Sequence, residues 1–224
     1  MPTRQWRRTA AALTVLPALL VTLAGPAAAA AVRLPEPSVP PIARAELNLL
    51  TVAEPRSTDG YSRDRFPHWS TRAAACDARE TVLARDGQNV QRDDACRAVS
   101  GSWYSAYDGR TLSSADDVDV SHIVPLANAW RSGADTWTDA ERESFANDLE
   151  RPQLLAVSAA SNRSRGDQGP ESWRPPLAAS RCMYARAWAD VKYHYRLTVT
   201  AEEKAALAEM LDTCRPQPAG EGRG

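Results

Sequence analysis

The feature that most constrains this chain is an N-terminal segment built like an export signal. Three arginines precede an apolar stretch over residues 9–24, which Gly25-Pro26 and five alanines follow. A basic start, a short apolar middle and small residues for cleavage are typical of a secretory signal peptide. Pro17 interrupts the stretch, which is also short of the ~20 residues of a membrane span. We therefore expect residues 1–31 to be removed and the protein to be secreted into the extracellular space.

Export also decides the state of the cysteines, which are Cys76, Cys96, Cys182 and Cys214. An even number of cysteines in an oxidising compartment predicts two disulfides. Three pairings are possible, and the most local joins Cys76 to Cys96 and Cys182 to Cys214. The close spacing that metal-binding cysteines use is missing, so we interpret all four as structural.

The composition is that of an ordinary globular protein. Of 224 residues, 25% are charged and 43% are hydrophobic, which excludes collagen-like, coiled-coil and wholly disordered chains. A multi-pass membrane protein is also excluded, because one apolar run alone is long enough to consider. Without residues 1–31 the chain carries 24 basic and 28 acidic residues, a net charge of −4. This charge counts modestly against tight nonspecific binding to nucleic acid.

The patterns along the chain predict one compact α+β domain over residues 51–214. A Pro-rich linker with a short helix over residues 32–50 precedes it, and a disordered tail over residues 215–224 follows. The expected elements are a helix over 71–85, a hairpin turning at Asp108-Gly109, a strand with Val118 and Val120, a helix starting at the capping box Thr138–Glu141, a buried strand over 154–157, and helices over 180–195 and 200–210. The polar residues 161–167 are expected to form turns.

Two residues suggest chemistry. His122 follows an acidic run, and Asn162 lies 40 residues later in the polar stretch after the buried strand. Neutral imidazole accepts a proton near pH 7, and oxygen ligands favour Mg²⁺, Mn²⁺ or Ca²⁺. A general base beside one divalent cation would suit hydrolysis. The alternative is plain: a lone histidine is more often a hydrogen-bonded core residue.

Several sequence blocks resemble one family. Residues 117–126, Asp-Val-Asp-Val-Ser-His-Ile-Val-Pro-Leu, look like the first half of the HNH, or ββα-metal, endonuclease motif, and residues 152–157 and 161–167 look like its second half. In order along residues 45–214, these and other blocks resemble secreted bacterial and fungal HNH-family proteins, related to the C-terminal domain of GmrSD-type restriction enzymes. The resemblance implies a ββα-metal core embedded in additional helices.

The resemblance also implies roles for single residues. His122 matches the base that activates water for attack on a phosphate, and Asn162 matches a metal ligand. Asp119 is the second candidate ligand, and Arg163 and Arg165 are candidates for binding phosphate oxygens. The implied cofactor is one divalent cation, with Mg²⁺ first and Mn²⁺ or Ca²⁺ as alternatives.

One position departs from the family pattern. The residue before the base is usually a metal-binding Asp or His, whereas this chain has Ser121, and a hydroxyl is a poorer ligand than a carboxylate. Asp119 lies on the same face of an extended strand and would reach an ion through water or a bulge. Ser121→Asp is therefore expected to raise activity or tighten metal binding. Asn147 is the substitute expected for the middle Asn of the motif, which braces the loop.

These observations support a secreted, metal-dependent HNH-type endonuclease that hydrolyses DNA, with RNA as a further candidate substrate, and with little sequence specificity. No recognition module accompanies the motif, and a monomer without membrane attachment is expected after signal cleavage. The alternative is a catalytically impaired HNH-fold protein that binds nucleic acid, which Ser121 motivates. A disulfide-stapled secreted protein without a nucleic-acid role is the third hypothesis.

Overall fold

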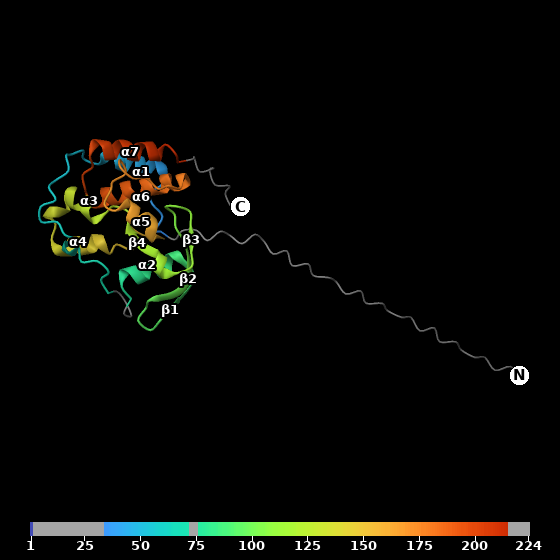
Figure 1. The fold of residues 1–224 in the computed structure, drawn as a ribbon. Helices are drawn as coiled ribbons and strands as arrows, with labels where there is room; N and C mark the ends of the chain where they lie inside the picture. The colour runs from blue at the N-terminus through green and yellow to red at the C-terminus, as the bar shows by residue number, and fades with distance from the viewer. Residues whose placement is uncertain (2–33, 72–75, 215–224) are drawn as a thin grey trace. The chain divides into compact units, whose positions relative to one another are not determined.

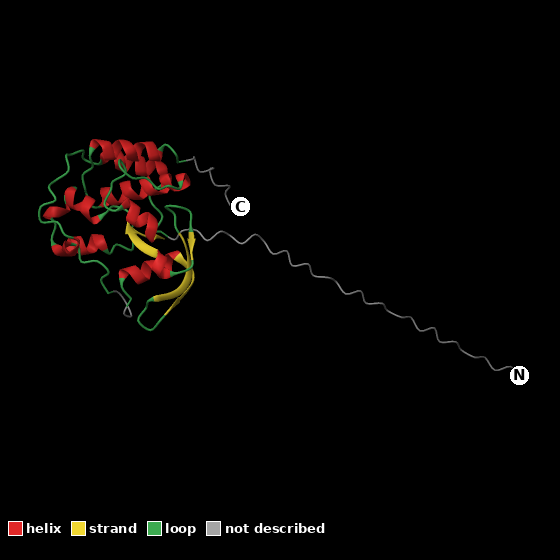
Figure 2. Cartoon of the chain, in the orientation of Figure 1, coloured by secondary structure: helices red, strands yellow, loops and turns green. Residues whose placement is uncertain are grey.

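The computed structural model of the protein describes residue 1, residues 34–71 and residues 76–214. Apart from Met1, the predicted signal peptide over residues 1–31 lies outside the described residues, as does the predicted tail over residues 215–224. In chain order (Figure 1), the helices and strands are α1 (Pro40–Leu49), α2 (Ala78–Asp86), β1 (Gly87–Arg92), β2 (Ala98–Tyr104), β3 (Thr111–Leu112), β4 (Val118–His122), α3 (Leu126–Arg131), α4 (Asp139–Ala146), β5 (Leu154–Ser158), α5 (Ala159–Arg165), α6 (Arg181–His194) and α7 (Ala201–Leu211). The fold is α+β, as predicted, with the strands gathered at one side of the helices (Figure 2).

The strands form two small antiparallel sheets. One has the order β1-β2-β3 and the other pairs β4 with β5. The predicted hairpin is present, because Trp103 of β2 pairs with Leu112 of β3 across the Asp108-Gly109 turn. Strand β1 was not predicted, because its sequence is mostly polar. Its register with β2 shifts twice.

The β4–β5 pair lies between two hydrophobic cores. Side chains alternate across a strand, so Leu155 and Val157 of β5 belong to the larger core, whereas Leu154 and Ala156 belong to the smaller one. Every residue of β5 is buried. The pair is therefore held from both faces, and its ends are fixed in position.

The larger core includes the segment that the sequence predicted to be a linker. Helix α1 packs against α6 and α7, and its Ala43 and Leu47 are fully buried. The helix begins at Pro40 because proline is tolerated in a first helical turn. Ser38 is tied to α6, since its backbone nitrogen donates to Asp190 Oδ2 over 3.1 Å. The compact domain thus extends upstream of residue 51, and the short helix predicted within residues 32–50 is present as α1, packed against α6 and α7.

Both disulfides have the most local of the three possible pairings. Cys76 is bonded to Cys96, and Cys182 is bonded to Cys214, with Cα–Cα separations of 5.2 and 5.0 Å. The second bond joins the start of α6 to the residues that follow α7. Among the described residues, no helix is long and apolar enough to cross a membrane.

One predicted helix boundary is wrong, and so is one stretch predicted to form turns. Helix α2 begins at Ala78 rather than near residue 71, because Asp77 caps it by accepting a hydrogen bond from the Glu80 backbone nitrogen; residues 72–75 lie outside the described part. The polar stretch predicted to form turns is helix α5 up to Arg165. Ser158 caps this helix by accepting from the backbone nitrogen of Ser161.

The capping box of α4 gives a stability prediction. Thr138 Oγ1 accepts from the Glu141 backbone nitrogen, and Glu141 Oε2 accepts from the Thr138 backbone nitrogen. Thr138→Ala removes one acceptor and should lower the free energy of unfolding by about 1 kcal/mol, as measured by urea denaturation. Thr138→Ser keeps the oxygen and should lose about half of that or less. Equal losses in the two variants would contradict the capping role.

Candidate active site

The candidate residues of β4 divide between its two faces. By the register with β5, His122 shares a face with Val120, while Asp119 and Ser121 share the opposite face. The face of Asp119 and Ser121 meets α5, whose Asn162 and Arg165 contact them. The candidate base His122 and the candidate ligand Asp119 therefore project from opposite faces of β4.

His122 is buried and its tautomer is fixed by one hydrogen bond. Its Nε2 lies 2.9 Å from the carbonyl oxygen of Ala146, at the end of α4. A carbonyl oxygen only accepts, so Nε2 carries the proton and Nδ1 of the neutral ring is an acceptor. Desolvation by burial lowers the pKa of His122 to about 3, an effect that nearby Arg63 reinforces and the Ala146 carbonyl opposes. The ring is neutral over the physiological range and has a free acceptor.

Asp119 and Asn162 lie together, as the sequence required of two ligands to one ion. Asn162 Nδ2 donates to Asp119 Oδ2 over 3.1 Å. One carboxylate and one amide oxygen fit a Mg²⁺ ion that keeps several of its waters. Among the described residues there is no cluster of three or more His, Cys, Asp or Glu side chains able to hold a metal. Asp119 and Asn162 could supply at most one carboxylate and one amide oxygen to a cation, so water would have to complete its coordination.

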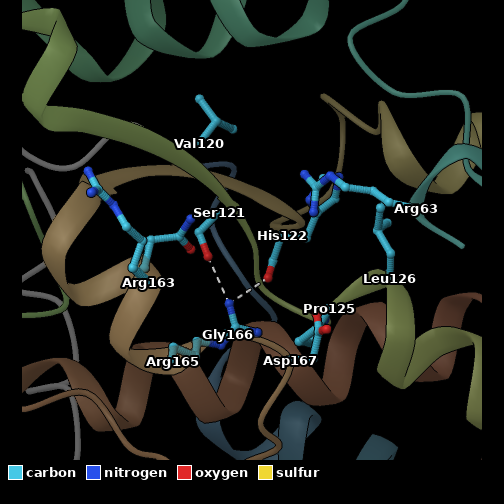
Figure 3. A pocket seen from close by; sticks show the side chains of 11 residues that line it. Arg63, Val120, Ser121, His122, Pro125, Leu126, Arg163, Arg165, Gly166 and Asp167 are labelled. Atoms are coloured by element: carbon cyan, nitrogen blue, oxygen red, sulfur yellow. Dashed lines mark hydrogen bonds between the residues drawn. The ribbon is translucent and has the colours of Figure 1, made fainter.

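Ser121 is occupied by a different partner. Its Oγ accepts from Nη1 of Arg165 over 2.7 Å, and the same guanidinium donates to the backbone oxygens of His122 and Ile123 over 2.7 and 2.6 Å. Figure 3 shows the bonds from Arg165 to Ser121 and His122. Arg165 is 1% exposed. Its guanidinium is therefore buried and bonded to the protein, which argues against the predicted contact between Arg165 and a phosphate.

A cavity of about 220 Å³ adjoins the residues of β4 and α5. Its lining includes His122, Asn162, Arg63 and Arg163. In Figure 3, Arg63 and Arg163 flank His122 and Ser121 from opposite sides. Both arginines are exposed, and guanidinium groups bind phosphate oxygens well. The cavity joins a proton acceptor, two exposed cations and an amide in one place.

Asn147 connects α4 to the segment that precedes α2. Its Nδ2 donates to the carbonyl oxygens of Pro67 and Glu143 over 2.7 and 2.8 Å, and its Oδ1 accepts from the Ser70 backbone nitrogen over 2.9 Å. The neighbouring Ala146 provides the carbonyl that holds His122. This is a bracing arrangement of the kind expected for Asn147.

Sequence reasoning missed two residues at the site. Arg63 lines the cavity and donates from Nε to His68 Nε2 over 3.2 Å. Trp69 stacks on His122, with ring centroids 5.5 Å apart and planes at 27°. Both lie within residues 60–69, one of the further blocks that resemble the family. The sequence pattern does not single out these two residues. Their contacts with the cavity and with His122 join segments that are distant in sequence and meet only in the tertiary fold.

Strand β4 carries His122 and pairs with β5, and helix α5, which directly follows β5, carries Asn162. The family model for GmrSD restriction endonucleases, C-terminal domain, matches residues 77–210. The chain belongs to this family of domains.

A curated protein extends the comparison. The chain is 56% identical over 180 residues to a protein of Arthroderma benhamiae described as an uncharacterized secreted protein, a match that covers 80% of this chain and 88% of the relative. Together with the N-terminal signal, this relative identifies the chain as a secreted protein. No solved structure matches it.

The lowered pKa of His122 predicts how stability depends on pH. In the unfolded chain the imidazole titrates near about 6.5, so below that pH the unfolded state binds a proton that the folded state does not. The free energy of unfolding should therefore fall as the pH falls from about 6.5 toward about 3, by up to ~1.4 kcal/mol per pH unit.

Urea denaturation of the wild type and of His122→Asn at several pH values measures this contribution. Asparagine retains a donor for the Ala146 carbonyl but does not titrate, so its profile should be flatter over this range. Identical slopes for both proteins would show that His122 titrates normally in the fold.

Proposed function

We propose that this protein is a secreted, metal-dependent endonuclease that hydrolyses phosphodiester bonds of DNA, with RNA as a further candidate substrate, and with little sequence specificity. The observation that carries the proposal is the fixed tautomer of His122. Its Nε2 is bonded to the Ala146 carbonyl, which leaves Nδ1 as the acceptor of a residue that lines a cavity together with Arg63 and Arg163. Membership of a family of restriction endonuclease domains supports a nucleic-acid substrate.

In the proposed reaction, His122 Nδ1 takes a proton from water while the water oxygen forms a bond to phosphorus. The bond from phosphorus to the leaving oxygen breaks, and that oxygen takes a proton from solvent. Arg63 and Arg163 bind the non-bridging oxygens and orient the phosphate. A divalent cation held by Asp119 and Asn162, with Mg²⁺ first and Mn²⁺ or Ca²⁺ as alternatives, would supply positive charge to the phosphate.

The net charge of −4 without the signal peptide is compatible with this function if binding is local and brief. Affinity for nucleic acid comes mainly from contacts to phosphates, and the exposed arginines of the cavity lie where such contacts are needed. We propose that the protein acts as a monomer on its nucleic-acid substrate.

One observation favours a second candidate, a catalytically impaired protein that binds nucleic acid. The position before His122, which usually carries a metal-binding Asp or His, is Ser121, and its hydroxyl is bonded to Arg165. If Asp119 and Asn162 alone do not retain the ion, binding remains and hydrolysis is lost.

Plasmid nicking by the purified, oxidised protein with Mg²⁺, Mn²⁺ or EDTA tests the proposal. His122→Ala should lower the nicking rate by about 10²–10⁴-fold, since the proton acceptor is removed. His194→Ala is the matched control, because His194 lines a different cavity and should leave the rate unchanged. Binding without nicking by the folded wild type would favour the second candidate, and full activity of His122→Ala would exclude this residue as the base.

The contact between Ser121 and Arg165 supports a different expectation for Ser121→Asp, namely little change in metal binding. The Ser121 oxygen lies 2.7 Å from Arg165 Nη1, so a carboxylate at this position would pair with the buried guanidinium. Mn²⁺ affinity, measured by electron paramagnetic resonance, should therefore stay within about twofold of the wild type, whereas Asp119→Asn should weaken it by about tenfold or more. Markedly tighter binding in Ser121→Asp would place the ion at residue 121 instead.

A further inference from the structure

Trp69 covers one face of the His122 ring. The two rings are stacked, with centroids 5.5 Å apart and planes 27° from parallel. Trp69 also packs against the smaller hydrophobic core, and it does not line the cavity that His122 adjoins. The indole therefore packs between the imidazole and the smaller core, and it is not placed to contact a substrate in the cavity.

The segment that carries Trp69 is held in an unusual backbone conformation. Trp69 has a φ of +59°, a left-handed region that bulky residues rarely adopt. Asn147 bonds the segment on both sides, since it donates to the Pro67 carbonyl and accepts from the Ser70 backbone nitrogen. A strained conformation persists where its surroundings fix it. Here the residue held in that conformation is Trp69, which stacks on His122.

The His122 ring would become positively charged on taking a proton, and Trp69 covers one face of that ring. Its nearest charged and titratable neighbours, Arg63, Arg165 and His68, all oppose a positive ring. The hydrogen-bond partner of the His122 ring at Nε2 is the Ala146 carbonyl, which is not a carboxylate. The Ala146 carbonyl at Nε2 and the π face of Trp69 are therefore the groups placed to stabilise an imidazolium.

We propose that Trp69 is a positioning residue for His122. Its indole fixes the plane of the imidazole, so that Nε2 remains on the Ala146 carbonyl and Nδ1 remains the acceptor, and its π face stabilises the imidazolium that forms when Nδ1 takes a proton from water. The electron pair of the broken O–H bond stays on the water oxygen, which attacks phosphorus. The catalytic part of this inference rests on the proposed function, whereas the positioning part is a property of the resting protein.

Kinetics of Trp69→Leu and Trp69→Phe on a defined DNA substrate test the catalytic part. Trp69→Leu removes the aromatic face and should lower kcat by about tenfold with KM unchanged, because Trp69 does not line the cavity. Trp69→Phe retains a π face and should recover kcat to within about threefold of the wild type. A change confined to KM, or equal loss of kcat in both variants, would overturn the catalytic part.

The ¹⁵N resonances of the His122 ring test the positioning part without any substrate. The wild type should show a single tautomer protonated at Nε2, and Trp69→Leu should show a mixture of tautomers or broadened signals. Unchanged ring resonances in Trp69→Leu would overturn positioning. If Trp69→Leu does not fold, Trp69→Met supplies an apolar side chain without a π face for the same measurements. A wild type that shows the fixed tautomer but no nicking would refute the proposed function and leave the positioning part supported.

Discussion

The buried guanidinium of Arg165 is the interaction on which the site depends. It has no carboxylate in a salt bridge among the described residues, and its charge is met by Ser121 Oγ and the carbonyl oxygens of His122 and Ile123. Four aromatic rings surround it at 5.8–5.9 Å, those of Tyr107, Trp173, Tyr184 and Trp188. Burial of a charge is costly unless hydrogen bonds and favourable electrostatics offset it. This arrangement locks the end of α5 against the end of β4.

The geometry of the site follows from this lock. Asn162 and Arg165 are three residues apart on α5 and share a helical face, while Asp119 and Ser121 are two apart on β4 and share a strand face. Once Arg165 is fixed on Ser121, Asn162 necessarily lies near Asp119, as the 3.1 Å contact shows. The same register turns His122 to the opposite face, where Trp69 and the Ala146 carbonyl meet it. One buried charge thus sets the position of α5 against β4.

Local sequence signals predicted the elements that local interactions make. The Thr138 capping box and the hairpin at Asp108-Gly109 need only neighbouring residues, and the structure confirms them. The errors have a common origin. The stretch over α5 looks like a turn because it is polar, yet it is helical because Ser158 caps it and Arg165 anchors its last turn in the core. The short helix α1 was expected beside a linker, and its packing against α6 follows from its buried Ala43 and Leu47.

The sequence alone determined the secretion signal, the even set of cysteines, the α+β class and the candidate residues His122, Asp119 and Asn162, because each follows from composition, short-range pattern or a linear motif. The tertiary structure decided what those residues touch. It buried Arg165, which had been assigned to phosphate, and it brought Arg63 and Trp69 to the site from a segment more than fifty residues upstream of His122. Such contacts join residues distant in the chain, so only packing of the whole domain fixes them.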